Sequence, residues 1–201
     1  MTIVEAPIDV AELGTGDASY IKWVPSDDWS RDMTTRTGYT FKVRPADVGD
    51  EAGLTAFFTH VTPDDLRFRF LSAISHVGPD QIERLTHVDH RGTENFLAFD
   101  ADHGTLVATA MMASDAALDT AEVAIAIHAD YKHRGIGWTL LEHVTRFAKS
   151  RGIKTLQSIE SRENHQAIEL EREMGFSVMA CPGDPTTVIV SVALHADTPA
   201  R

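Results

Sequence analysis

Hydrophobic residues recur with two different periods along this chain, and the change between them marks its central elements. In residues 122–127, β-branched side chains alternate with small ones around a single carboxylate, which predicts a strand. Further along, apolar side chains recur three and four positions apart, which predicts an amphipathic helix: Leu140, Leu141, Val144, Phe147 and Ala148. A basic turn with two glycines, residues 132–137, joins this strand to this helix.

The same patterns predict the remaining elements. Strands are expected at 39–44, 95–99, 105–112, 155–159, 176–179 and 187–192, and helices are expected to begin near Asp50, Thr62, Gly78 and Asn164. Thr62 followed by Pro63 combines a good N-cap with proline at the first helical position. Gly152 stands where a glycine commonly ends a helix. Strands and helices in this order predict a mixed α/β fold.

The first 38 residues differ from the rest, since no hydrophobic period persists there. They nevertheless contain Tyr20, Trp23 and Trp29, and disordered tails are poor in aromatic residues. We therefore expect a partly flexible extension over 1–38 whose aromatic rings dock on the main domain or on a neighbour. A single domain over 39–195 and a tail over 196–201 complete the expected organisation. A chain beginning at Gly38 is expected to keep ligand binding, because every candidate binding motif lies beyond that residue, but to lose stability.

Composition excludes several classes of protein. The net charge of −12 argues against a general nucleic-acid binder or an anionic-membrane binder. No apolar run approaches the roughly 20 residues that a membrane span needs, and the amino terminus does not resemble a secretory signal. Cys181 is the only cysteine, so an internal disulfide is excluded and a small half-buried thiol is expected. These features favour a cytoplasmic protein.

The turn at 132–137 has the properties of a phosphate-binding site. The first turn of a helix offers free backbone N–H groups and the positive end of the helix dipole, and glycines let a ligand approach closely. A Walker loop is excluded because Trp138 and Thr139 follow the glycines. The dinucleotide fingerprint is not matched because its third glycine is replaced by Leu140.

The pattern that fits is Gln/Arg-x-x-Gly-x-Gly/Ala, with Lys132 in the first place. It resembles the acyl-CoA pyrophosphate loop of the GNAT superfamily of N-acetyltransferases. A second motif runs from Asn164 through Ala167 and Leu170 to Gly175-Phe176, and it is similar to the last helix of that superfamily. The resemblance covers residues 40–194. It implies a GNAT fold, in which a mostly antiparallel sheet of six to seven strands is splayed at its central strand.

The resemblance also implies acetyl-CoA as cosubstrate, with no metal, and an amine as acceptor. Transferred position by position, it implies these cofactor contacts: Ile125, Ile127, Lys132, His133, Arg134, Gly135, Ile136, Gly137, Trp138 and Asn164. Glu171 is a departure, because many members have a tyrosine there as general acid for the leaving thiol. A thiol with a pKa near 8.5 can also leave as the thiolate.

A finer similarity concerns three segments, residues 44–47, 66–72 and 85–90. They resemble bacterial protein lysine acetyltransferases that modify acyl-CoA synthetases. That resemblance implies a protein lysine as acceptor, and the chain is too short for the ligase-like regulatory domain often fused to such enzymes. A monomer or a homodimer is expected.

Glu122 is the candidate general base. At pH 7 only about one lysine amine in 2,500 is neutral, so attack on a thioester needs a group that accepts a proton. Glu122 is the only carboxylate in its apolar strand, on the face shared with Ala124, Ala126 and His128. It lies about 20 Å of strand from the phosphate turn, which is comparable to an extended pantetheine arm. The alternative is a solvated carboxylate at the start of a strand.

Other readings remain open at this point. The acceptor could be a small amine or a peptide amino terminus, or the chain could be a non-catalytic acyl-CoA-binding module. His128 is a weaker candidate base, since it is expected beside the phosphate turn. Arg67 and Arg69 are expected to pair with acidic neighbours. His87, Asp89 and His90 could be imagined as metal ligands, but the reaction needs no metal.

Overall fold

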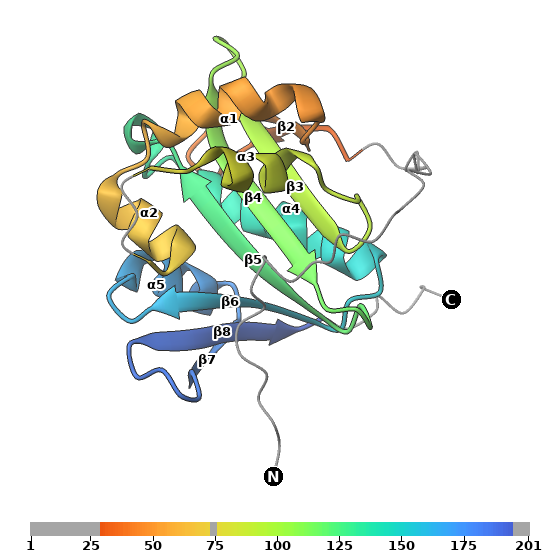
Figure 1. Cartoon of the computed structure of the whole chain (residues 1–201), viewed down its shortest axis with the longest axis vertical. Coiled ribbons are helices and arrows are strands. Elements are labelled where there is room, and N and C mark those ends of the chain that lie inside the picture. Colours follow the sequence, from red (N-terminus) through yellow and green to blue (C-terminus); the bar gives the residue numbers. More distant parts are fainter. Residues whose placement is uncertain (1–28, 73–75, 195–201) are drawn as a thin grey trace.

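The computed structural model describes residues 29–72 and 76–194. An eight-stranded sheet, in the order β1-β2-β3-β4-β5-β6-β8-β7, forms its centre (Figure 1). Every neighbouring pair is antiparallel except β5 and β6, which are parallel. The strands are β1 (Arg31–Thr34), β2 (Thr40–Pro45), β3 (Thr93–Asp100), β4 (Leu106–Ser114), β5 (Thr120–Ile127), β6 (Thr155–Ser161), β7 (Ser177–Ala180) and β8 (Thr187–Ala193).

Helices cover both faces of the sheet (Figure 1). They are α1 (Glu51–Phe58), α2 (Pro63–Phe70), α3 (Pro79–Thr86), α4 (Ile136–Ser150) and α5 (His165–Glu173). The predicted helix starts and stops are confirmed where the caps form. The Thr62 side chain accepts a hydrogen bond from the Asp65 N–H, and Gly152 follows α4 with φ of +78°. None of the described helices is long and apolar enough to span a bilayer.

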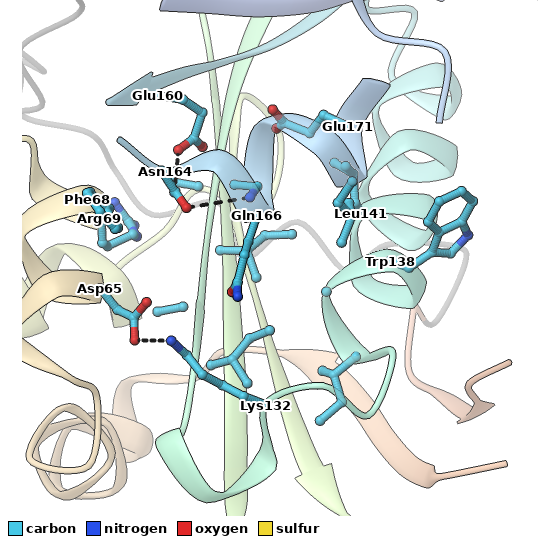
Figure 2. Close-up of a pocket in the computed structure, with 18 of the residues that line it drawn as sticks. Asp65, Phe68, Arg69, Lys132, Trp138, Leu141, Glu160, Asn164, Gln166 and Glu171 are labelled. Carbon is cyan, nitrogen blue, oxygen red and sulfur yellow. Dashed lines mark hydrogen bonds and ion pairs between the residues drawn. The ribbon is translucent and has the colours of Figure 1, made fainter. Parts of the chain in front are cut away.

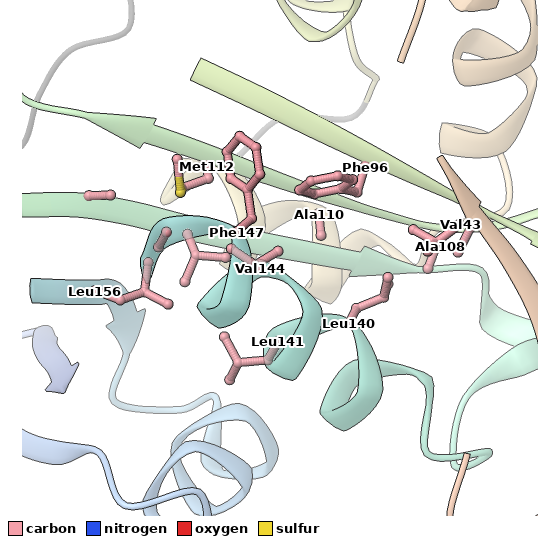
Figure 3. Close-up of a cluster of buried hydrophobic side chains, with 14 of the residues drawn as sticks. Val43, Phe96, Ala108, Ala110, Met112, Leu140, Leu141, Val144, Phe147 and Leu156 are labelled. Carbon is pink, nitrogen blue, oxygen red and sulfur yellow. The ribbon is translucent and has the colours of Figure 1, made fainter. Parts of the chain in front are cut away.

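Two hydrophobic cores lie on opposite faces of the sheet. The apolar stripe predicted for α4 is buried against β3, β4 and β6, as Figure 3 shows for Val144, Phe147, Phe96 and Leu156. The second core lies beneath α1, α2 and α3 and is built around Leu54, Phe57, Phe58, Leu66, Ile82 and Leu85. The sheet is therefore packed against helices on both of its faces.

The sheet has one strand more than the upper number expected from the sequence, and that strand is β1. It lies within the segment interpreted as an extension and pairs with β2 from Arg31↔Val43 to Thr34↔Thr40. Trp29, just before β1, packs edge-on against Phe147 of α4, with ring centroids 5.2 Å apart. The docking expected for the aromatic residues of the extension is therefore observed for Trp29. Tyr20 and Trp23 lie outside the described residues.

The predicted splay falls between β5 and β6. These strands pair over three residues only, from Thr120↔Thr155 to Glu122↔Gln157. Beyond that point β5 continues along β4 as far as Ile127, and β6 continues along β8 as far as Ser161. The β4–β5 pairing has no register shift, so the alternation of side chains predicted for β5 holds. The two halves of the sheet separate directly after Glu122.

Candidate active site

A cavity of about 660 Å³ occupies the space between the separating strands (Figure 2). It is bounded by β5, by the turn that precedes α4, by the carboxyl end of β6 and by α2 and α5. Because the edge of β5 faces this space, residues from both faces of the strand line it, including Glu122, Ile125 and Ile127. These three residues, which the sequence singled out as a base and as cofactor contacts, thus line the same cavity as the phosphate turn.

The turn before α4 is shaped by two left-handed residues. His133 has φ of +61° and Gly135 has φ of +80°, and α4 begins at Ile136. A Cβ atom on Gly135 would lie 3.1 Å from the Thr35 Cβ, and one on Gly137 would lie 3.4 Å from the Ile127 Cδ1. The contact at Gly135 is tighter than side chains normally make, whereas the one at Gly137 is at van der Waals distance. The turn thus presents bare backbone and the amino end of a fifteen-residue helix to the cavity.

The basic side chains of the turn go in different directions. Lys132 lies across the cavity and its Nζ is 2.5 Å from Oδ2 of Asp65 on α2 (Figure 2). Arg134 bonds the carbonyl of Asp130 at 3.1 Å, and its guanidinium lies 4.6 Å from the centre of the Tyr131 ring. It is not among the residues that line the cavity. Any direct contribution of Arg134 to a ligand would therefore come from its backbone.

Trp138 and Asn164 line the cavity from opposite sides (Figure 2). Trp138 belongs to the first turn of α4, and the guanidinium of Arg36 lies 3.8 Å from its ring centroid. Asn164 is the N-cap of α5, where its side chain accepts a hydrogen bond from the Ala167 N–H. All the predicted cofactor residues except Arg134 therefore line this cavity.

The far end of the cavity is acidic. Burial raises the pKa of Glu122, and the positive charge of Arg69 partly opposes that shift. The pKa of Glu160 is raised to about 8, chiefly by burial and then by the charge of the neighbouring Glu171, while a hydrogen bond from Asn164 opposes the shift. The pKa of Glu171 is raised to about 7 by burial. Three carboxyl groups with raised pKa values thus share one end of the cavity.

Arg69 provides the compensating charge at this end. Its side chain, on α2, is half-buried, and its pKa is lowered to about 10 because burial outweighs the opposing charges of Glu122 and Glu160. Arg69 therefore interacts with its acidic neighbours Glu122 and Glu160 through their charges, and no direct ion pair of Arg69 is found in residues 29–72 and 76–194. Arg67, in contrast, forms a direct ion pair with Glu163 at 2.8 Å.

Sequence reasoning missed several residues that line the cavity, among them Arg36, Asp65 and Glu160. Glu160 shows why. It lies near the end of an ordinary strand pattern, with no motif around it. It enters the site only because β6 separates from β5 before reaching it. The one available signal was its spacing of four residues from Asn164.

Two other candidates from the sequence, His128 and Asp89, have structural roles. His128 accepts a hydrogen bond from the Asp130 N–H and stacks on His60, as expected for a satisfied histidine at a strand end. Asp89 accepts hydrogen bonds from the Arg91 and Thr93 N–H groups and so stabilises a turn. Within residues 29–72 and 76–194, no three side chains gather as metal ligands would. Cys181 is a free, half-buried thiol.

The fold and the cavity define the class of protein as an acetyltransferase that transfers an acetyl group to an amine. More particularly, the chain belongs to the acetyltransferase (GNAT) family, whose sequence model matches residues 55–176. Members of this family use acetyl-CoA.

Individual relatives agree with this assignment. An acetyltransferase of Pseudomonas aeruginosa is 27% identical over 173 residues, which cover 85% of this chain and 92% of the relative. The crystal structure of the GNAT domain of S. lividans PAT superposes with a TM-score of 0.76 at 25% identity, covering 83% of this chain and 97% of that domain. A spermidine N-acetyltransferase from Vibrio cholerae, solved with CoA and spermine, shares the fold alone: its TM-score is 0.62 at 17% identity, with 77% of this chain and 95% of that one covered.

Proposed function

We propose that this protein transfers the acetyl group of acetyl-CoA to the side-chain amine of a protein lysine, with Glu122 as general base. The observation that carries the proposal is the position of Glu122. It lies at the last position where β5 pairs with β6, inside the cavity, at the opposite end from the phosphate turn. The acetyl donor supplies an activated thioester when bound.

The residues of the cavity fit acetyl-CoA. The diphosphate would be held by the backbone N–H groups at the start of α4, which Gly135 and Gly137 leave uncovered. The strand between Ile127 and Glu122 would run alongside the pantetheine arm. Five residues of strand span about 17 Å, which suits that arm.

The environment of Glu122 suits a base. A carboxylate in water has a pKa near 4.3 and holds a proton weakly, whereas burial raises the pKa of Glu122. A raised pKa brings the group closer to the operating pH, where general bases are most effective. Glu122 accepts a proton from the ammonium group of the acceptor, and the neutral amine then attacks the acetyl carbon. The new N–C bond replaces the C–S bond of the thioester, and coenzyme A leaves as the thiolate, which takes up the second proton that the nitrogen loses. The positive charge of Arg69 opposes this rise in pKa and so favours the ionised form of Glu122.

The acceptor end of the cavity favours a cation. Six carboxylic side chains line the cavity: Asp65, Glu122, Glu160, Glu169, Glu171 and Glu173. Three strongly basic side chains accompany them: Arg36, Arg69 and Lys132. Because the pKa values of Glu160 and Glu171 are about 8 and about 7, these two groups are partly protonated near neutral pH, and an approaching ammonium group favours their ionised forms. The lining therefore attracts an ammonium group such as that of lysine. The protein-lysine assignment itself rests on the three segments similar to bacterial lysine acetyltransferases and on the likeness to the S. lividans PAT domain.

A small polyamine or a peptide amino terminus is the second candidate acceptor, because the acidic lining attracts any ammonium group equally well. Assay of acetyl transfer against protein lysines, polyamines and peptide amino termini separates the candidates. The expected result is turnover with protein lysines that exceeds turnover with the other amines. Transfer only to a small amine would contradict the lysine assignment while leaving the reaction class in place.

Glu122→Gln tests the base. The substitution keeps the volume but removes the basicity, so acetyl-CoA affinity should persist while turnover falls by roughly 10²–10⁴ near neutral pH. The loss should shrink as pH approaches the pKa of the amine. Glu142→Gln, on the exposed side of α4, is the matched control and should retain parental turnover. Parental turnover in Glu122→Gln would return Glu122 to a structural role.

A further inference from the structure

The turn between β1 and β2, residues 35–39, is docked on the phosphate turn. The Thr37 hydroxyl donates a hydrogen bond of 2.7 Å to the carbonyl of Arg134. Thr35 is buried and packs against Gly135: a Cβ atom added to Gly135 would lie only 3.1 Å from the Thr35 Cβ. Within the β1–β2 turn, the Thr35 N–H bonds the Tyr39 carbonyl at 2.8 Å and the Gly38 N–H bonds the Thr35 carbonyl at 2.9 Å. A closed, rigid turn therefore touches the loop expected to hold the diphosphate.

Arg36 extends from the apex of this docked turn into the cavity lining. Its guanidinium stacks 3.8 Å from the centre of the Trp138 ring. No carboxylate in residues 29–72 and 76–194 forms an ion pair with it. Stacking covers one face of the guanidinium and leaves its N–H edges available, the arrangement in which arginine binds phosphate through two hydrogen bonds.

The other strong cations near the phosphate turn are already engaged. Lys132 is paired with Asp65, and Arg134 is directed at the Asp130 carbonyl and away from the cavity. Arg36 is thus the strong cation that remains available at this end of the described cavity. Its charge matters more because the whole chain carries a net charge of −12, which repels an anionic ligand.

Coenzyme A carries a diphosphate and a separate 3′-phosphate, and the phosphate turn provides a site for the diphosphate only. Its diphosphate is matched by the open N–H groups of α4, but the 3′-phosphate on its ribose needs a separate partner. We propose that Arg36, held by Trp138 and by the docked β1–β2 turn, binds the ribose 3′-phosphate of coenzyme A. This inference rests on the use of acetyl-CoA in the proposed function. It places a cofactor-binding residue outside the segment 55–176 that matches the family.

The test is calorimetric measurement of affinity for acetyl-CoA and for 3′-dephospho-acetyl-CoA. The parent protein should bind the dephospho form about tenfold more weakly, since one charge-assisted contact is lost. Arg36→Gln should bind acetyl-CoA about tenfold more weakly than the parent, yet bind the dephospho form as the parent does. Arg84→Gln, which removes an exposed arginine of α3 outside the cavity, should match the parent with both ligands.

Two results would overturn the inference. If Arg36→Gln binds acetyl-CoA as tightly as the parent, Arg36 does not contact the cofactor. If it weakens both ligands equally, Arg36 acts on the diphosphate or on the shape of the loop. In both cases the proposed function stands, because the parent still binds acetyl-CoA. A parent that binds neither ligand overturns the proposed function together with this inference. Melting of the unliganded variant should equal that of the parent and exclude misfolding.

Discussion

The Asn164 side chain joins the start of α5 to the end of β6, with its Nδ2 donating a hydrogen bond of 2.7 Å to Oε2 of Glu160. Its Oδ1 accepts from the Ala167 N–H at the same time. One amide therefore caps a helix and holds a carboxyl group in the cavity. These two tasks can be separated by substitution.

Asn164→Ala removes both contacts, whereas Asn164→Ser keeps a capping oxygen and loses only the donor to Glu160. We expect the alanine variant to lower the free energy of unfolding by about 0.5–1 kcal/mol, and the serine variant to recover most of that loss. Chemical denaturation at one pH measures both. Equal destabilisation in the two variants would show that the contact with Glu160, and not the cap, stabilises the helix.

The stability of the unliganded protein should fall as pH rises from about 6.5 to about 8. Glu160 and Glu171 have folded-state pKa values of about 8 and about 7, raised from an ordinary value of 4.5. In this interval the folded state holds protons that the unfolded state has released, so raising the pH favours unfolding. The measurement is the free energy of unfolding at several pH values.

Glu160→Gln should reduce that slope, because glutamine does not titrate. His90 contributes in the same direction, since Glu94 raises its pKa, so the difference between parent and variant is the informative quantity. Glu142→Gln is the control and should keep the parental slope. An unchanged slope in Glu160→Gln would mean that Glu160 ionises normally in the folded protein.

Gly135→Ala should weaken both folding and acetyl-CoA binding. A left-handed alanine costs about 1–2 kcal/mol of backbone strain, and the new Cβ would lie 3.1 Å from the Thr35 Cβ. Gly152→Ala imposes a similar strain, with φ of +78°, but meets no atom within 4 Å. Comparing the two variants therefore separates the effect of backbone strain, which both share, from the effect of the contact with Thr35, which only Gly135→Ala makes. If both variants bind acetyl-CoA normally, the close approach to Thr35 does not shape the loop.

Trp29→Ala should destabilise the domain by about 2 kcal/mol or more, because the ring packs edge-on against Phe147 and His143. The folded variant should bind acetyl-CoA with parental affinity, since Trp29 does not line the cavity. Thermal melting and calorimetry together check this expectation. Trp29→Phe is the conservative control and should lose less stability.

The structure changes the behaviour expected of a chain that begins at Gly38, for which the sequence alone predicts unchanged ligand binding. The truncation removes β1 and, with it, the contacts of Thr35 and Thr37 to the phosphate turn. We expect lower melting and weaker acetyl-CoA binding. The truncation also removes Arg36. Retention of parental affinity in the truncated chain would therefore show that the phosphate turn keeps its shape unaided, and it would contradict a contact of Arg36 with the cofactor.

Most of the fold could be predicted from local patterns. Periodicity located α4 and β5, and capping chemistry located the start of α2 at Thr62, because these signals depend on neighbouring residues alone. The phosphate turn was equally visible, since glycines and a helix start follow one another in the sequence. The placement of Glu122 inside the cavity followed from its isolation in an apolar strand.

What the sequence did not predict depends on contacts between distant segments. Strand β1 is four residues long and shows no alternation long enough to recognise. The direction of Arg134 depends on Tyr131 and on Asp130, which the motif does not encode as partners. The role of Glu160 depends on where two strands stop pairing, and a strand pattern carries no information about its neighbours.

The strand order has a consequence for how copies of this protein can associate. The two outermost strands, β1 and β7, are each four residues long, and β1 carries the exposed charges of Arg31 and Asp32. Short, charged edge strands are poor templates for extending a sheet into another molecule. Within the described residues, the sheet thus ends in edges that resist intermolecular β-pairing and the aggregation it causes. A homodimer would then need to form through side-chain surfaces, leaving the backbone ladder within one chain.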